Sequence, residues 1–280
     1  IMPTALITGV STGIGLATAK KLLALGWRVY GSVRRADDAK ALQEAQPDLF
    51  HTLVFDVTDR AAIQSGMDQI EANGHQLTAL VNNAGIAVSG PLEKLSEADI
   101  QKQFDVNVFG LLRLTQVALP LLHDSVASGL SPVRIVNVSS VSGYVASPYT
   151  SLYSASKFAV EALTDGLRRE LQDFDIDVVS IAPGPVKTPI WEKASARKHV
   201  FEGRYASVLP LLDPYLENAM KMAIPAEVVA NKIAAALNAN SPKPDQIVMP
   251  KAWIIRLMRI LPKRWVDSLT QRRLKSTKRY

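Results

Sequence analysis

Short apolar runs alternate with amphipathic stretches along most of this chain. The runs have the length and continuous apolarity of strands buried on both faces, and they fall at residues 4–8, 28–33, 50–55, 77–82, 133–139, 176–182 and 246–249. Helical periodicity marks the segments at residues 14–25, 37–45, 59–72, 96–127, 152–172 and 225–239. This alternation predicts the α/β class, with a doubly wound, mostly parallel seven-stranded sheet in a single domain over residues 1–250.

Two segments depart from this alternation. Residues 189–224 are long, contain three prolines and carry many apolar side chains, which predicts a substrate lid at the edge of the sheet. Residues 251–280 form a basic, amphipathic C-terminal extension, in which apolar residues recur at helical spacing with cations between them. Pro262 divides the extension into two expected short helices, and Pro120 predicts a kink or a division in the helix at 96–127.

The charge of the chain is concentrated in that extension. The net charge is +6, but residues 251–280 hold ten basic residues and one acidic residue, so they carry +9 and leave −3 for residues 1–250. Such a local patch indicates an anionic partner or a solvated surface. With tryptophans on its apolar side, the extension suits peripheral contact with a membrane interface. Alternatively, its apolar face covers the protein's own core or a subunit interface.

Composition excludes several kinds of chemistry. The 280 residues, 48% of them hydrophobic, suit one large domain. The absence of cysteine excludes disulfides and thiolate chemistry, and the four scattered histidines predict no metal site. No signal peptide is visible, and no stretch reaches the roughly 18 consecutive apolar residues of a membrane span. We therefore expect a cytoplasmic protein, associated with membranes if the extension binds lipid.

A glycine-rich turn joins the first predicted strand to the first helix. Gly9, Gly13 and Gly15 follow the strand at 4–8 with the spacing G-x-x-x-G-x-G. Glycines let a backbone approach a pyrophosphate closely, and a helix N-terminus offers free N–H groups and the positive end of its dipole. The turn therefore predicts a nucleotide-binding loop, although a plain strand–helix turn would use similar residues.

Tyr153 and Lys157 lie four residues apart in a predicted helix, so they share one face. A tyrosine with a reference pKa of about 10 is a poor acid–base catalyst near neutral pH. A neighbouring ammonium favours the phenolate and moves that pKa toward the working range. The pair indicates acid–base chemistry, but as an isolated match it is equally typical of a surface helix.

These motifs occur together with several others, and their order resembles that of the short-chain dehydrogenase/reductase family. The resemblance covers residues 3–250 and rests on Thr8–Gly15, Asn82–Gly85, Asn107, Ser139–Ser140, Tyr153, Lys157 and Pro183–Thr188. It implies a Rossmann-like fold and an NAD(P)-dependent oxidoreductase that interconverts an alcohol and a carbonyl. The expected substrate is a hydrophobic small molecule such as a steroid, a retinoid or a lipid ketone. Relatives are commonly homo-oligomers.

The resemblance implies four catalytic roles. Tyr153 is the general acid or base, and Lys157 lowers its pKa and binds the nicotinamide ribose. Ser140 polarises the substrate oxygen. Asn107 interrupts a helix and holds a water that relays protons to Lys157. Alternatively, the serine merely follows a strand and the asparagine caps or bends a helix.

The resemblance also implies a cofactor site. Thr188 is expected to bind the nicotinamide carboxamide and Asp56 the adenine, although Asp56 is equally suited to capping a turn. The expected cofactor-binding residues are Gly9, Ser11, Thr12, Gly13, Ile14, Gly15, Arg34, Asp56, Val57, Asn83, Ala84, Gly85, Tyr153, Lys157, Pro183, Gly184, Val186 and Thr188.

The end of the second strand favours NADP over NAD. Val33 stands where an NAD-binding acid is expected, and Arg34 follows it, suited to a 2′-phosphate. NAD remains open, since Thr12 replaces a second basic residue and Asp37 and Asp38 lie nearby.

Two other functional classes remain as alternatives. One is a catalytically silent dinucleotide sensor on the same fold. The other is a membrane-associated adaptor that uses the basic extension. No nucleic-acid-binding module is recognisable, so no nucleic-acid partner is expected.

Overall fold

A computed structural model describes residues 2–190 and 198–276. Seven parallel strands form one sheet in the order β3-β2-β1-β4-β5-β6-β7. The strands are β1 (Thr4–Thr8), β2 (Arg28–Val33), β3 (Phe50–Val54), β4 (Ala79–Asn82), β5 (Val133–Val138), β6 (Ile176–Pro183) and β7 (Asp245–Val248). The predicted α/β class and doubly wound sheet are confirmed, and each strand lies within two residues of its predicted bounds.

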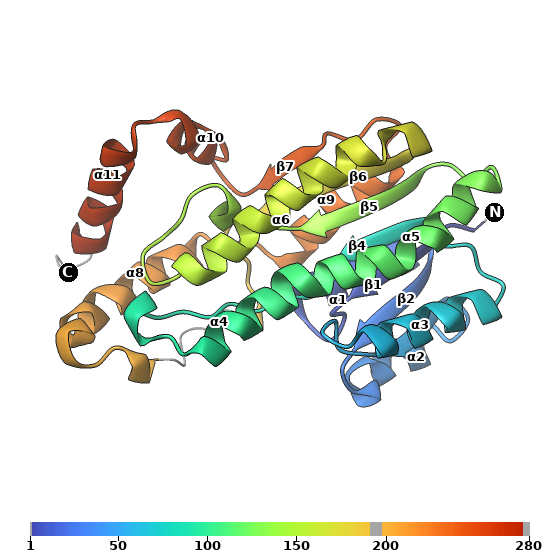
Figure 1. Ribbon diagram of the computed structural model, residues 1–280, viewed down its shortest axis with the longest axis horizontal. Coiled ribbons are helices and arrows are strands. Elements are labelled where there is room, and N and C mark those ends of the chain that lie inside the picture. The colour runs from blue at the N-terminus through green and yellow to red at the C-terminus, as the bar shows by residue number, and fades with distance from the viewer. Residues whose placement is uncertain (1, 191–197, 277–280) are drawn as a thin grey trace.

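Helices cover both faces of the sheet (Figure 1). On one face lie α1 (Gly13–Ala24), α2 (Lys40–Ala45) and α9 (Ala226–Asn238). On the other lie α3 (Arg60–Ala72), α5 (Leu111–Ala127) and α6 (Ser151–Glu170). Side chains of β1 alternate between the layers, with Ala5 and Ile7 in the first core and Leu6 in the second. The inner strands β1, β4 and β5 are buried along their whole length, which accounts for their mainly apolar sequences.

The helix predicted at 96–127 is interrupted, but not at its proline. It consists of α4 (Glu97–Phe104), a π-helical turn η3 (Asp105–Gly110) and α5. The predicted interruption at Asn107 is confirmed by η3, whereas Pro120 lies inside α5 without dividing it. Pro120 and Gln116 are exposed, so the carbonyl that loses its hydrogen bond faces water.

Among the described residues, one helical run, Glu97–Ala127, is long and apolar enough on average to cross a membrane, with a mean hydropathy of 1.3 over its best window. More than half of that window, 56%, is buried inside the protein. The run supplies Leu114, Ala118 and Leu122 to the core against the sheet, so burial within the fold accounts for its apolarity.

The C-terminal elements gather at the end of the molecule opposite the N-terminus (Figure 1). They are α8 (Leu209–Lys221), α10 (Trp253–Ile260) and α11 (Lys263–Ser276), and the last two are the helices predicted on either side of Pro262. Leu274 of α11 packs with Leu212 and Phe201 in a small separate cluster. Shorter turns are η1 (Ala36–Ala39), η2 (Leu92–Lys94), η4 (Val141–Gly143), η5 (Gln172–Phe174), η6 (Lys198–Val200) and η7 (Gly203–Val208).

Candidate active site

The strand order reverses between β1 and β4, which opens a crevice at the carboxyl ends of these strands. A cavity of about 860 Å³ lies there and continues past the ends of β5 and β6. Of the predicted catalytic and cofactor-binding residues, only Gly15 and Asn107 do not line this cavity. The fold therefore brings together side chains from positions 9 to 188 of the chain.

The loop from β1 to α1 forms one wall of the cavity. Gly9 and Gly13 have φ angles of 72° and 59°, a region that favours glycine. Thr12 precedes α1 but makes no capping hydrogen bond with its side chain, so it leaves the first N–H groups of the helix for another acceptor. Those groups and the helix dipole suit a pyrophosphate, and the adjoining cavity has room for one.

Gly15 allows close packing behind the glycine-rich loop, and its expected contact with the cofactor stays a prediction. A Cβ atom at Gly15 would lie 2.2 Å from the carbonyl oxygen of Gly9 and 2.5 Å from Nδ2 of Asn83. That amide nitrogen donates to the carbonyl oxygens of Thr8, at 2.8 Å, and Gly9, at 3.3 Å. Asn83 thereby ties the loop after β4 to the glycine-rich loop, and Gly15 allows the close approach.

The residues after β2 and β3 form the far end of the cavity. Arg34 and Asp38 both line it, and Asp38 is ion-paired with Arg35 at 2.8 Å. Val33, where an acid would indicate NAD, is buried. Asp56 lines the cavity and also accepts hydrogen bonds from the backbone N–H and hydroxyl of Thr58, so both roles considered for it from the sequence are compatible with the structure.

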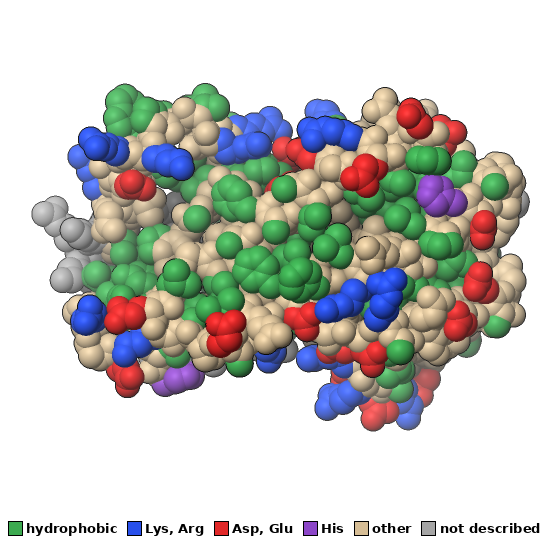
Figure 2. All heavy atoms as spheres, viewed as in Figure 1, with side chains coloured by type: hydrophobic (Ala, Val, Ile, Leu, Met, Phe, Trp, Pro, Cys, Tyr) green, Lys and Arg blue, Asp and Glu red, His purple; other side chains and the backbone are tan. Residues whose placement is uncertain are grey.

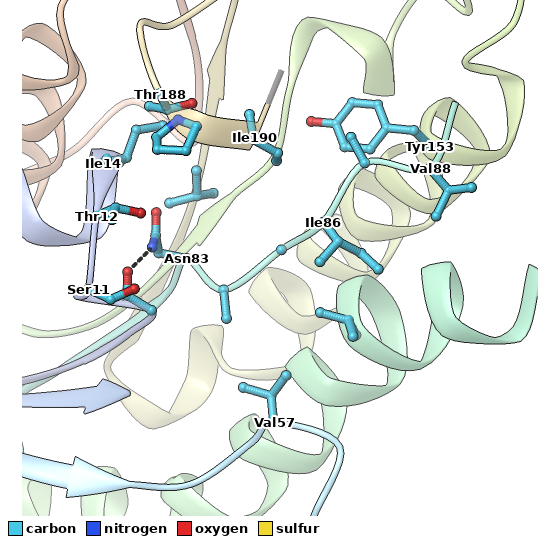
Figure 3. Close-up of a pocket in the computed structure, with 18 of the residues that line it drawn as sticks. Ser11, Thr12, Ile14, Val57, Asn83, Ile86, Val88, Tyr153, Thr188 and Ile190 are labelled. Carbon is cyan, nitrogen blue, oxygen red and sulfur yellow. Dashed lines mark hydrogen bonds between the residues drawn. The ribbon is translucent and has the colours of Figure 1, made fainter. Parts of the chain in front are cut away.

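Tyr153, Ser140 and Lys157 meet where β5 ends and α6 begins. Figure 3 shows the Tyr153 hydroxyl directed toward Ile190, and both residues line the cavity. This hydroxyl and the Ser140 side chain are hydrogen-bonded. The Lys157 Nζ donates to the carbonyl oxygen of Val138 at 2.8 Å and lies 5.9 Å from the centre of the Tyr153 ring. The three side chains are nearly inaccessible to solvent, at 6–7% exposure.

Burial is the largest cause of the pKa shifts of Tyr153 and Lys157. It raises the pKa of Tyr153 above 10.0, and the hydrogen bond with Ser140 opposes the rise. It also lowers the pKa of Lys157 from 10.5 to about 8, against the opposing charge of Glu161. Burial is the largest cause of the Tyr153 shift and the Lys157 ammonium donates to the Val138 carbonyl oxygen, so the expected lowering of the tyrosine pKa by Lys157 stays a prediction.

Asn107 shapes the cavity from behind. Its Oδ1 accepts from the N–H of Ile86 at 2.8 Å, and its Nδ2 donates to the Ile86 carbonyl oxygen at 3.0 Å and to Ser156 Oγ at 3.1 Å. The side chain thus holds the segment after β4. The predicted water relay would have to use the backbone of the π-helical turn, and it stays a prediction.

Gln103 is a site residue that sequence reasoning missed. It is fully buried, accepts from the N–H of Val88 at 2.7 Å and donates to the Ile86 carbonyl oxygen at 3.0 Å. The signal was present in the sequence, since Gln103 and Asn107 are amides four residues apart on one helical face. Together they hold Ile86 and Val88 by hydrogen bonds to their backbone, and Figure 3 shows the Val88 side chain near Tyr153.

The chamber beside Tyr153 is largely apolar. Ile86, Val88 and Ile190 line the cavity there. Of the predicted lid at 189–224, Pro189 and Ile190 are the described residues that contribute to the lining, whereas residues 191–197 lie outside the part of the chain that the structure describes. Among the described residues from 199 to 224, a group of apolar side chains that includes Phe201 and Leu212 packs with Tyr149 and with Leu274 of α11.

Chemically, the cavity can hold a dinucleotide and bring a proton to one end of it. The first-turn N–H groups of α1 can bind phosphate, Arg34 can meet a further anion, and Thr188 faces Gly13 across the opening. Lys157, Ser140 and Tyr153 are polar groups at the apolar end, where a carbonyl could accept a hydrogen bond.

Comparison with known proteins gives consistent results. The sequence matches the short chain dehydrogenase family over residues 3–199. It is 39% identical over 275 residues to an NADPH-dependent 3-dehydrocapnine reductase of Ornithobacterium rhinotracheale, covering 97% of both chains. It is 33% identical over 183 residues to a 3-ketodihydrosphingosine reductase of Bacteroides thetaiotaomicron, covering 65% of this chain and 64% of the other. A short-chain dehydrogenase/reductase from Burkholderia phymatum, solved with NAD, superposes with a TM-score of 0.78 at 25% identity over 92% of both chains.

Proposed function

This chain belongs to the short-chain dehydrogenase/reductase family of NAD(P)-dependent oxidoreductases, and we propose that it reduces the ketone of a long-chain lipid with NADPH as the preferred donor. The observation that carries the proposal is the Tyr153 hydroxyl, hydrogen-bonded with Ser140 and directed into an apolar chamber at one end of a dinucleotide-sized cavity. The reaction converts a C=O group to a CH–OH group.

In this reaction Ser140 and Tyr153 bind the carbonyl oxygen. The nicotinamide cofactor supplies the hydride to the carbonyl carbon and is oxidised. Tyr153 transfers its proton to the oxygen as negative charge develops there, and the Ser140 hydroxyl stabilises that charge. The phenol is protonated at neutral pH and can donate, but burial raises its pKa and so makes it a weaker acid, and we infer that the charge of Lys157 offsets this effect during proton transfer.

Lys157 supports the tyrosine after proton transfer. A protonated amine stabilises the phenolate that remains, and the carbonyl oxygen of Val138 orients its Nζ. Since the pKa of Lys157 is about 8, most molecules carry this charge at neutral pH and lose it in alkaline solution.

The preference for NADPH rests on Arg34. Its side chain lines the end of the cavity beside the buried Val33, and the nearby carboxylate of Asp38 is partly neutralised by Arg35. A guanidinium there favours a 2′-phosphate over a 2′-hydroxyl. The relative from Ornithobacterium rhinotracheale is named as NADPH-dependent, which agrees with this preference.

The proposed substrate class rests on two observations. Ile86, Val88 and Ile190 make the chamber beside Tyr153 apolar. Two relatives carry names that describe reduction at a 3-dehydro or 3-keto position, of capnine and of dihydrosphingosine. We infer a 3-keto compound with a long alkyl chain rather than a steroid, a retinoid or a small aldehyde.

The test is a substrate screen that follows the absorbance of reduced nicotinamide. Purified protein is mixed with NADPH or NADH and with 3-ketodihydrosphingosine, a ketosteroid, retinal or a short aldehyde, and the Tyr153→Phe variant serves as the blank. We expect the long-chain 3-ketone with NADPH to give the highest kcat/KM. Equal rates in the blank would contradict the catalytic role of Tyr153, and a preference for retinal or the steroid would contradict the substrate class.

A further inference from the structure

The two C-terminal helices each carry an apolar face that packs against the rest of the protein. On α10 the half-buried residues are Ile254, Ile255 and Met258. On α11 Val266 and Thr270 are half-buried and Leu274 is buried at 6% exposure. This inward face satisfies the expectation that the extension covers part of the protein's own core.

A second apolar face points away from the protein. Trp253, Leu257 and Ile260 recur at i, i+4 and i+7 of α10 and are 61%, 41% and 80% exposed. Trp265 and Leu269, one turn apart on α11, are 63% and 50% exposed. We call these five residues the outer stripe. Exposing tryptophan and isoleucine side chains to water is unfavourable in free energy. Because a different face of these helices packs inward, an exposed apolar face of this kind indicates an interaction surface.

Cations border the outer stripe. Arg256, Lys263, Arg264 and Arg272 are exposed. Figure 2 shows hydrophobic and cationic side chains next to one another on the surface at the end of the molecule where α10 and α11 lie. Residues 251–280 have one acidic residue against ten basic ones, so the extension that carries the stripe has a strongly positive net charge.

Arg259 has a different role from these cations. Its guanidinium lies over the ring of Tyr144 at 4.5 Å and 3.6 Å from a carboxylate oxygen of Asp245 at the start of β7. It therefore fixes α10 to the catalytic domain, and it helps to hold the stripe on the outside.

We propose that the outer stripe docks on an anionic membrane surface. Tryptophan and aliphatic side chains would enter the boundary between headgroups and acyl chains, while the bordering cations bind anionic lipid. Charge makes a second copy of this chain a poor occupant, because pairing the same face would bring two extensions of +9 together. The proposal does not depend on the catalytic chemistry.

Co-sedimentation of the full-length protein with vesicles tests the proposal. We expect binding to phosphatidylglycerol/phosphatidylcholine vesicles and at least tenfold weaker binding to pure phosphatidylcholine. The combined variant Trp253→Ser, Leu257→Ser, Ile260→Ser should lose at least tenfold in affinity for the anionic vesicles. A control variant, Leu25→Ser with Val228→Ser, also removes apolar surface, at positions 50% and 40% exposed outside the extension, and should bind as the parent does.

Tryptophan fluorescence provides a second readout that separates insertion from surface attraction. Anionic vesicles should shift the emission of Trp253 and Trp265 to shorter wavelength, and the double variant Trp253→Phe, Trp265→Phe should lose the shift. Binding without a shift, or equal binding by the stripe variant, would overturn the proposal by assigning the affinity to charge alone. Absence of binding to anionic vesicles would overturn it too, as would a stripe-dependent dimer in analytical ultracentrifugation that excludes vesicles. The Tyr153→Phe variant should bind vesicles as the parent does, so failure of this proposal is distinct from failure of the proposed reaction.

Discussion

The wall of the cavity and the C-terminal helices α10 and α11 differ in how their most distinctive side chains are used. In the wall, the side-chain amides of Asn83 and Asn107 form hydrogen bonds with the backbone of neighbouring segments. In the extension, Trp253 and Ile260 project into solvent at 61% and 80% exposure. These wall side chains have their hydrogen-bond partners within the protein, whereas the extension leaves apolar side chains exposed to solvent. The comparison indicates that the first region is built for a small ligand and the second for an external surface.

Removing the Tyr153 hydroxyl should have the largest effect on activity. Tyr153→Phe removes the proton donor and should lower kcat by about 100-fold to 10,000-fold, while the dissociation constant for NADPH changes little. Steady-state kinetics and nucleotide titration measure the two quantities. Tyr149→Phe is the matched control, since that ring packs on Phe201 and does not line the cavity. Equal losses in both variants would contradict the assignment.

Adding one methyl group to the glycine-rich loop should damage the wall without touching the cavity. Gly15→Ala puts a Cβ 2.2 Å from the Gly9 carbonyl oxygen and should lower the free energy of unfolding by about 1–3 kcal/mol. Nucleotide affinity should fall as well, since the loop must shift. Gly166→Ala in α6 is the control, because its nearest neighbour would be 3.9 Å away, and it should stabilise by about 0.5–1 kcal/mol. Urea unfolding checks both, and an unchanged stability of Gly15→Ala would refute the close packing.

The same test on the extension compares its two faces. Leu274→Ala empties a buried position and should cost about 2 kcal/mol of local stability, because cavities in packed clusters are costly. Leu269→Ala on the outer stripe should change stability by less than about 0.5 kcal/mol. Hydrogen exchange of the α11 amides measures the difference. Equal losses of stability in Leu274→Ala and Leu269→Ala would contradict the assignment of Leu274 to the inward face and Leu269 to the outward face of α11.

Cofactor choice should respond to the charge at the far end of the cavity. Arg34→Ala removes the guanidinium proposed to meet a 2′-phosphate and should raise the KM for NADPH by about 10-fold, with little change for NADH. Arg35→Ala breaks only the ion pair with Asp38 and should have a smaller effect on that ratio. The ratio of kcat/KM for the two cofactors is the measurement. An unchanged ratio in Arg34→Ala would remove the basis for NADP preference.

The smallest effect should be a shift in pH dependence. Reduction should slow as pH rises through about 8, where Lys157 loses its proton. Glu161 raises the pKa of Lys157, so Glu161→Gln should move this alkaline limb to lower pH by up to about one unit. Glu170→Gln, at the exposed end of α6, should leave it in place. A pH profile of kcat for the three proteins decides.

Linkage gives the same lysine an effect on stability. The folded pKa of Lys157 is about 8 and its ordinary value is 10.5, so the unfolded chain binds more protons between these values. The contribution of Lys157 to the free energy of unfolding should therefore increase with pH across that window. A Lys157→Met variant should lack this dependence in urea unfolding.

Several features followed from the sequence because they are local. Runs such as Val133–Val138 are predominantly apolar, and this pattern favours burial on both faces. The glycine spacing and the Tyr153–Lys157 pair likewise depend on short-range geometry. Gln103 was missed, since its partners Ile86 and Val88 are more than a dozen residues away. Pro120 does not divide α5, because the exposed carbonyl of Gln116 tolerates the lost hydrogen bond, whereas a kink at Pro120 stays a prediction.

The sequence by itself determined the α/β sheet, the family and the two short helices of the extension, because periodicity and motif spacing depend on residues that are close together in the chain. Only the tertiary structure decided that burial raises the pKa of Tyr153, that Gly15 lies in close contact with Gly9 and Asn83, and that the extension has two apolar faces. Desolvation, close approach and exposure arise between segments distant in the chain, so they are properties of the packed molecule.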